Sequence, residues 1–458
     1  MQRDLTQGPI ARNLLLFALP LMAGNLLQQL YNVADTWVVG RFLGSEALAA
    51  VGSSYTLMTF LTSIFLGLCM GTGTAFAIQY GRKNMERLRQ SLFVSFILIA
   101  GITLLLTVLV FLLLDLILLW MQTPLELMTM MREYLWYIFW GIPALFLYNY
   151  FANVLRSVGN SAVPLLFLAI SSVLNIALDL LFVLAFHWGV AGAAIATVLS
   201  QYLSGIGILL YTLLRFPELR IGRRHMRWDR KILREISHFS FLTCVQQSVM
   251  NLGILMVQGC INSFGTVVMA AFAAAVKIDS FAYMPVQDFG NAFSTFVAQN
   301  YGAGQTERIR KGIRSSLLCV FIFCVCITSL VCLFARPLML LFIDASETAI
   351  LDVGVQYLYI EASFYLGIGV LFMLYGYYRA VGRPGISVVL TVISLGTRVA
   401  LAYTLSAIPF IGVTGIWVSV PIGWFLADLT GVLIYLRSRK KTTPRVPWHA
   451  GPVHFCPE

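Results

Sequence analysis

The feature that most constrains this chain is a series of apolar runs that each contain twenty or more residues. Clear examples are 92–114, 163–186 and 315–334. A helix rises about 1.5 Å per residue, so each run is long enough to cross a hydrocarbon layer about 30 Å thick. Because a helix satisfies its own backbone hydrogen bonds, it is the structure that such a run adopts in lipid. The sequence therefore predicts an all-α membrane protein.

The composition excludes the soluble classes of protein. Charged residues make up only 11% of the 458 residues, whereas a soluble domain needs about a quarter. The first apolar run carries Asp35 and ends at Gly40-Arg41 without a cleavage signal, so we interpret it as a retained helix. The cysteines lie almost all within apolar segments, which argues against a metal site or a disulfide framework. No cofactor is expected.

Twelve helices are predicted, in two pseudo-symmetric six-helix bundles around a central cleft. We expect them at 14–39, 53–79, 91–119, 128–155, 163–186, 190–213, 236–262, 267–300, 315–342, 348–378, 384–408 and 412–436. The predicted domains are an N-terminal lobe (1–213), a basic cytoplasmic linker (214–235), a C-terminal lobe (236–436) and a cytoplasmic tail (437–458).

The positions of the basic residues predict how the chain is oriented. Of the 31 Lys and Arg residues, 26 fall in alternate connections, namely the N-terminus, 80–90, 156–162, 214–235, 301–314, 379–383 and the tail. This asymmetry follows the positive-inside rule and places both termini in the cytoplasm. Insertion and contact with anionic lipid then explain the net charge of +11, and nucleic acid is not needed as a partner.

The second half of the chain repeats the first. Residues 79–89 match 300–310 at an offset of 221, and 156–159 (Arg-Ser-Val-Gly) match 379–382 (Arg-Ala-Val-Gly) at an offset of 223. Six helices per half give both halves one orientation, so an axis along the membrane normal relates them, as in parallel-repeat transporters. Such transporters bind cargo near the midplane and work by alternating access.

These motifs resemble those of the multidrug and toxin extrusion (MATE) family. The resemblance covers residues 5–437 and is carried by 5–10 (Leu-Thr-Gln-Gly-Pro-Ile), 31–35 (Tyr-Asn-Val-Ala-Asp), 44–52, 299–304 and Arg156 with Gly159-Asn160. In the first lobe it is similar to the DinF-like bacterial subgroup. It implies a monomeric exporter in the bacterial plasma (inner) membrane, driven by Na⁺ or H⁺, that is not an enzyme.

The resemblance implies a cation or proton site at four residues and a kinking proline, Pro20, which would serve as a hinge. The site residues are Asp35, Asn175, Asp179 and Thr197. Helical rise independently places the two acids and the threonine about 10–12 Å below the outer surface, with the asparagine one turn deeper. Oxygen donors suit Na⁺, and two buried carboxyl groups also favour a shared proton. Interhelical hydrogen bonding alone is the structural alternative.

Amide and aromatic residues of the first lobe predict a site for flat organic molecules, with cation–π attraction for positively charged ones. The candidates are Gln28, Tyr31, Asn32, Asn149 and Asn153.

The second lobe has fewer candidate site residues than the first. Its candidates for a second protonation site or a substrate contact are Lys277, Asp279, Glu361 and Arg398, although a neutralising Glu361–Arg398 pair explains two of them structurally. Helix 236–262 has Gln246 and Gln247 where the NorM-like pattern leads us to expect an acid. Asp288 is expected near a helix end, solvated or paired.

The favoured function is antiport of organic, often cationic and aromatic compounds out of the cell against H⁺ or Na⁺. The alternative is a flippase for a lipid-linked sugar or peptidoglycan precursor. A flippase is expected to have a strongly cationic cavity, and the sequence suggests only Lys277 and Arg398 within the membrane. An intramembrane enzyme for pyrophosphate chemistry would need an Asp-rich Mg²⁺ motif, which the sequence lacks. Gly67, Gly71 and Gly73 predict close helix packing.

Overall fold

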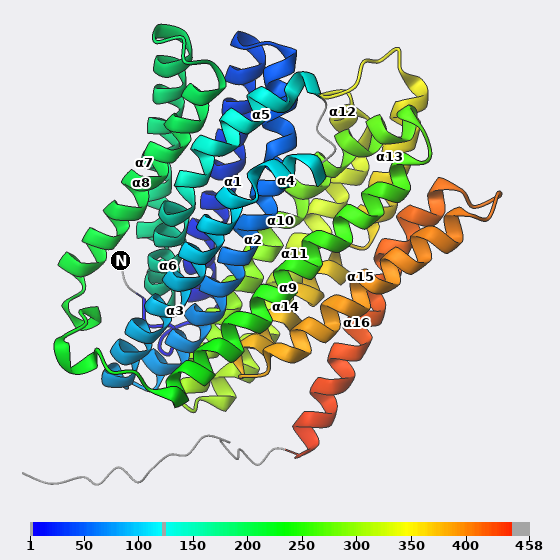
Figure 1. Cartoon of the computed structure of the whole chain (residues 1–458). Coiled ribbons are helices and arrows are strands. Elements are labelled where there is room, and N and C mark those ends of the chain that lie inside the picture. The colour runs from blue at the N-terminus through cyan, green and yellow to red at the C-terminus, as the bar shows by residue number, and fades with distance from the viewer. Residues whose placement is uncertain (1–2, 121–124, 442–458) are drawn as a thin grey trace, which may run out of the picture.

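The computed structural model describes residues 3–120 and 125–441, and helices and short connections account for this part of the chain (Figure 1). The helices of the first half are α1 (Ile10–Phe42), α2 (Ser45–Gly81), α3 (Met85–Leu112), α4 (Leu114–Trp120), α5 (Leu125–Ile138), α6 (Ile142–Ser157), α7 (Ala162–Leu180) and α8 (Gly189–Arg215). Those of the second half are α9 (Arg230–Asn262), α10 (Thr266–Gly302), α11 (Thr306–Leu333), α12 (Ala335–Met339), α13 (Thr348–Ser363), α14 (Tyr365–Ala380), α15 (Pro384–Ser406) and α16 (Val413–Lys441).

The membrane-spanning architecture is confirmed. Among the described residues, eleven helices are long and apolar enough to cross a membrane, and the bent pair α13 and α14 makes a twelfth if it counts as one span. The chain is therefore a multi-pass membrane protein. Most of the predicted tail, 442–458, lies outside the described residues, and 437–441 continue α16.

Four predicted helices are interrupted or bent. The helix expected at 128–155 is interrupted by a 3-10 turn, Phe139–Gly141, between α5 and α6. The helix expected at 91–119 is interrupted at Leu113, and the helix expected at 315–342 is interrupted at Phe334. The helix expected at 348–378 bends by 51° at Phe364. The helix expected to begin at 53 instead begins at Ser45.

The bend at Phe364 has a local cause and local support. Ser363 Oγ donates to Tyr359 O, and a serine that bonds back to the preceding turn bends a helix. Hydroxyl and thiol groups of α11 then satisfy the carbonyls at the break: Thr328 Oγ1 donates to Ala362 O (2.6 Å) and Cys324 Sγ to Tyr365 O (3.4 Å). Neighbouring side chains thus replace helical bonds that lipid could not.

The halves match in their helices as well as in their motifs. Helices α1 and α9 each have 33 residues, α2 and α10 each have 37, α3 and α11 each have 28, and α6 and α14 each have 16. The offset of 221 or 223 that relates the sequence motifs also relates the starts of most of these helices.

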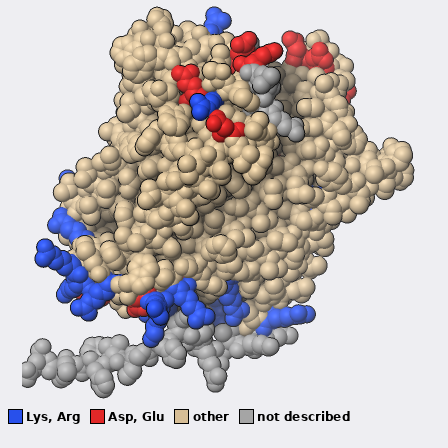
Figure 2. Space-filling view, in the orientation of Figure 1, with Lys and Arg blue, Asp and Glu red and all other residues tan. Residues whose placement is uncertain are grey.

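Charge is separated along the long axis of the molecule. Figure 2 shows Lys and Arg gathered at one end and most Asp and Glu at the other. We call these the basic end, which includes the connections 82–84, 216–229 and 303–305, and the acidic end, which includes 113–120 and 334–347. The chain begins and α16 finishes at the basic end (Figure 1).

Glycines bring the two halves into backbone contact toward the basic end. A Cβ on Gly67 or Gly71 of α2 would overlap the backbone of α9, which confirms close packing there. A Cβ on Gly81 would overlap Gln299 O of α10, and one on Gly302 would overlap Ile78 O of α2. The last two contacts are equivalent under the repeat, so the halves cross reciprocally. Only glycine allows this approach.

The N-terminal segment 3–8 packs against both halves at the same end. Leu5 is fully buried, and its N–H donates to Gln299 Oε1 of the second half (3.2 Å). Arg308 donates to the carbonyl oxygens of Leu5, Gln7 and Gly8. Arg3 N donates to Gly159 O of the first half (3.0 Å). The segment therefore ties both halves together.

We expect the substitution Gly302→Ala to separate the halves at the basic end, because its Cβ occupies the position of Ile78 O. Spin labels on the exposed residues Lys83 and Lys311 should report longer distances than in the parent protein. Gly101→Ala is the matched control, since a Cβ at Gly101 has nothing within 4 Å. Identical distance distributions in all three proteins would mean that this contact does not hold the end closed.

Candidate functional site: a cavity between the halves

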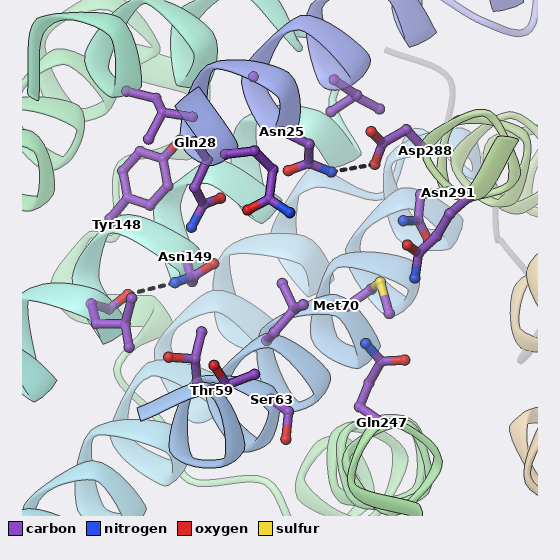
Figure 3. Close-up of a pocket in the computed structure, with 18 of the residues that line it drawn as sticks. Asn25, Gln28, Thr59, Ser63, Met70, Tyr148, Asn149, Gln247, Asp288 and Asn291 are labelled. Carbon is purple, nitrogen blue, oxygen red and sulfur yellow. Dashed lines mark hydrogen bonds between the residues drawn. The ribbon is translucent and has the colours of Figure 1, made fainter. Parts of the chain in front are cut away.

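A cavity of about 590 Å³ lies between the two halves. Helices α1, α2 and α5 to α8 line it from the first half, and α9, α10 and α14 from the second. Figure 3 shows polar side chains from five of these helices directed at a common space, among them Gln28, Thr59, Asn149, Gln247 and Asn291. A cavity of this volume, with polar groups converging on it, has the size and character of a small-molecule site.

The structure brings the four predicted cation-site residues together at the wall of this cavity. Asn175 Nδ2 donates to Thr197 Oγ1 (3.2 Å), which joins α7 to α8. The carboxyl groups of Asp35 on α1 and Asp179 on α7 lie next to each other, close enough for their charges to interact. Asp35, Asn175 and Thr197 line the cavity, whereas Asp179 is fully buried behind them.

The two carboxyl groups lack other partners. Among the described residues no N–H or O–H donor reaches Asp35 Oδ1 or either oxygen of Asp179. Two ionised carboxylates at close range repel each other, and a proton on one of them removes that repulsion. The same oxygens, with those of Asn175 and Thr197, would otherwise suit a hard cation.

Two tyrosines enclose this pair. Tyr31 of α1 and Tyr134 of α5 lie close enough to both carboxyl groups for their charges to interact. Tyr134 is 8% exposed. Both tyrosines line the cavity, as Asp35 does.

All five residues predicted to contact substrate line the cavity. Asn149 Nδ2 donates to Leu145 O and Asn153 Nδ2 donates to Asn149 O, both within α6. Asn32 Nδ2 donates to Gln29 Oε1. Because the amide N–H groups are partly used within the protein, the amide oxygens are left as acceptors for a bound molecule. Pro20 also lines the cavity, in the interior of α1.

The second-lobe candidates lie outside this cavity. Asp279 accepts from Tyr365 Oη (2.7 Å) and Tyr357 Oη (3.3 Å). Glu361 is 1% exposed and neither of its oxygens has a donor among the described residues.

The basic candidates of that lobe are not directly paired. Arg398 lies close enough to Asp279 and Glu361 to interact with both charges. The expected direct Glu361–Arg398 ion pair is absent from the ion pairs of the described residues, although Arg398 still interacts with the charge of Glu361. Lys277 is exposed, with Nζ 6.0 Å from the ring centre of Phe342.

Sequence reasoning misplaced three charged residues of the cavity. Asp288 was expected near a helix end, but it lies inside α10, is 3% exposed, and accepts from Asn25 Nδ2 of α1 (2.5 Å). Arg156 and Arg379 were assigned to loops at the basic end, but they lie in the last turns of α6 and α14 and line the cavity. Their place in the repeat was the signal that could have identified them.

Comparison with known proteins gives a consistent result. The MatE family pattern matches residues 20–181 and 240–404. The probable multidrug resistance protein YpnP of Bacillus subtilis is 31% identical over 96% of this chain and 97% of its own. The FAD transporter of Shewanella oneidensis is 27% identical over 92% and 93%. The crystal structure of MATE in complex with MaL6 superposes with a TM-score of 0.89, is 24% identical, and covers 96% of this chain and 99% of that one.

The carboxyl pair makes a prediction about stability. Asp179→Asn replaces one of two facing carboxyl groups by an amide that donates to the other, so we expect the unfolding midpoint in detergent to rise by about 2 °C or more. The gain should be larger in alkaline than in acidic buffer, because alkali removes the shared proton and leaves two like charges. The control is Asp344→Asn at the exposed acidic end. A gain that does not vary with pH would contradict the shared proton.

Proposed function

Because the chain belongs to the MatE family of multidrug efflux transporters, we propose that it is a secondary antiporter that moves organic molecules out of the cell in exchange for H⁺ or Na⁺. The observation that carries this proposal is the contact between Asp35 and Asp179 at the wall of the cavity. A transporter needs a group whose ion occupancy can change, and buried acids that face a cavity are suited to that task.

The coupling follows from the position of α1. This helix carries Asp35 and also Asn25, Gln28 and Asn32, which line the cavity. When Asp35 and Asp179 take up a positive ion, their repulsion ends and α1 can move toward α7. Cavity-lining groups on α1 then shift together, which weakens their hold on cargo and favours its release.

Pro20 is the proposed hinge for this movement. It has no N–H to donate within α1. In the adjoining turn, Ser161 Oγ donates to Phe17 O (2.8 Å), so a side chain outside the helix satisfies that carbonyl. A helix weakened at this point can bend without exposing an unpaired group to lipid.

The direction of transport follows from the charge distribution. With the basic end in the cytoplasm, as the positive-inside rule requires, both termini are cytoplasmic. The contacts at Gly81, Gly302 and Leu5 then close the cytoplasmic side. Export requires these contacts to open in another state. The two lobes, 1–213 and 236–436, would then rock relative to each other within a monomer in the bacterial plasma membrane.

Amide oxygens and tyrosine rings favour cationic, aromatic cargo. The alternative, a flippase for lipid-linked precursors, was disfavoured because the sequence suggested few cations in the membrane. Arg156 and Arg379 now line the cavity, which weakens that objection. Two relatives also differ in cargo, since one is named for multidrug resistance and one for FAD. We retain export of organic molecules as the function.

Within the family, the residues at Asp35, Asn175, Asp179 and Thr197 support a place in the DinF-like subgroup. Coupling by the second lobe is a weaker proposal, because Glu361 and Asp279 lie away from the cavity.

We expect Asp35→Asn to abolish export of a cationic dye such as ethidium while the protein accumulates normally in the membrane. The amide cannot take up the ion whose binding drives the cycle. Dye efflux from cells, normalised to protein by immunoblot, measures the effect, and Asp344→Asn serves as the control. Undiminished efflux by the Asp35 variant would rule out coupling at this residue.

Coupling to an ion gradient can be measured directly. Purified protein in liposomes should move dye when the gradient of its coupling ion, H⁺ or Na⁺, is imposed in the correct direction, and should not move dye when both gradients are absent. The two gradients applied separately identify the ion. Transport that persists without any gradient would contradict antiport.

A further inference from the structure

Arg156 and Arg379 occupy equivalent positions in the two halves, each three residues before a glycine, Gly159 or Gly382. Both lie in the last turn of their helices and line the cavity toward the basic end. The helices that carry them cross equivalent partners at equivalent places: Gly73 of α2 approaches Asn153 of α6, and Gly376 of α14 approaches Ser294 of α10. The repeat therefore delivers two guanidinium groups to one cavity.

Both guanidinium groups converge on the same face of α10. Arg379 Nη2 donates to Asn291 Oδ1 (3.1 Å) and its Nε to Ser294 Oγ (3.4 Å). Arg156 interacts with the charge of Asp288, one turn away on that helix. Asp288 and Asn291 are three residues apart on α10, about 4.5 Å along the helix, so both arginines interact with the same turn of α10.

The two charges are not neutralised. In the part of the chain that the structure describes, neither arginine forms an ion pair, and Arg156 Nε has no hydrogen-bond acceptor. Arg379 is 3% exposed, yet its bonds go to neutral groups. Asp288 is the one acid near them among the cavity-lining residues, and one of its oxygens already accepts from Asn25. Two positive charges therefore face one negative charge.

A structural role alone does not account for this arrangement. A basic residue in the last turn of a helix is stabilised by the helix dipole, which fits Arg156 and Arg379 in part. The side chain of Arg379, however, reaches across to α10 rather than toward the carbonyls of its own helix end. A buried charge without a counter-ion is unfavourable, and a bound anion would remove that penalty.

We propose that Arg156 and Arg379 form a binding site for the anionic group, carboxylate or phosphate, of a molecule held in the cavity. Planar guanidinium groups bind both oxyanions in bidentate fashion. Asn291 completes the site, because its Oδ1 accepts from Arg379 and its Nδ2 is left to donate to the anion. This inference rests on the proposed function, since it defines the cargo of the same cavity.

The cavity is therefore polarised along its length. Asp35 lies ten residues beyond Asn25 on α1, about 15 Å along the helix, and Asn25 contacts Asp288 beside the arginines. A cargo that spans the cavity meets a carboxyl group near the acidic end and guanidinium groups near the basic end. The class of molecule that fits is an aromatic zwitterion, with its amine toward Asp35 and its acid toward Arg156 and Arg379.

A matched pair of dyes tests this site. One is a fluorescent xanthene dye with a free benzoate group, and the other is the methyl ester of the same dye. Fluorescence polarisation with the purified full chain in nanodiscs gives the affinity for each. We expect Arg156→Gln and Arg379→Gln each to lower the acid-to-ester affinity ratio about tenfold, the effect of losing one charge-assisted hydrogen bond.

Two further variants separate recognition from folding. Arg383→Gln removes an exposed arginine four residues from Arg379 and should leave the ratio unchanged. Arg379→Lys keeps the charge without the planar fork, so its ratio should fall between those of the parent and the glutamine variant. If Arg379→Gln does not fold, the half-buried Arg156 still provides the test. An unchanged ratio in Arg156→Gln, or equal losses for acid and ester, overturns the proposal.

The lipid composition of the nanodisc distinguishes two sources of the anion, the cargo and an anionic lipid headgroup. In nanodiscs of phosphatidylcholine alone, an acid dye held by the arginines binds without competition. If adding phosphatidylglycerol weakens binding of the acid dye, and Arg156→Gln abolishes that competition, the site takes a lipid headgroup phosphate; without competition it takes the carboxylate of cargo. Export of the ester dye is measured separately, so failure of the anion site remains distinguishable from failure of antiport.

Discussion

The rest of this structure depends on one constraint: inside a bilayer, each polar group must find its partner within the protein. Most of the chain obeys it. Hydroxyl groups of many membrane residues donate back to their own helix, as Thr103 does to Ile99 and Thr391 does to Ser387, and the broken span at Phe364 is repaired by Thr328 and Cys324 of α11.

Against that background, the groups left without partners are informative. They include the carboxyl oxygens of Asp35 and Asp179, those of Glu361, and the Nε of Arg156. Unsatisfied charge in such a setting is unfavourable unless something else binds there during the working cycle. Asp35 and Arg156 line the cavity and Asp179 lies directly behind its wall, whereas Glu361 lies outside it, so most of these groups are placed where cargo or an ion could reach them.

The repeat explains why the two ends of the cavity differ. At the basic end both halves keep the arginine, so Arg156 and Arg379 act as a pair. In the carboxyl layer the halves have diverged, because the repeat offsets relate Asp35 to Met256, Asp179 to Ala402 and Asn175 to Arg398. The second half therefore cannot form the same ion site. The proposed ion site belongs to one half, whereas both halves contribute an arginine to the cavity, so a repeated scaffold carries different groups at its two ends.

Much of the fold was predictable, because membrane spans follow from the length and hydrophobicity of the apolar runs. Helical rise also placed Asp35, Asn175, Asp179 and Thr197 in one layer, since depth depends only on position within a span. Helix breaks were not predictable in this way: the bend at Phe364 arises from Ser363 and from contacts with α11 that lie far away in sequence.

The cavity arginines escaped prediction for a related reason. When basic residues are counted by connection, every arginine near a helix end is assigned to the membrane–water interface. The count does not distinguish an arginine that points to lipid headgroups from one that points into the protein. Arg379 points inward because Gly376 lets α14 approach α10 closely enough for the guanidinium to reach Asn291 and Ser294. The depth of a residue in the membrane follows from its position along its own helix, but the direction in which its side chain points depends on how the helices pack. In this protein the inward direction of the Arg156 and Arg379 side chains places two positive charges in the cavity.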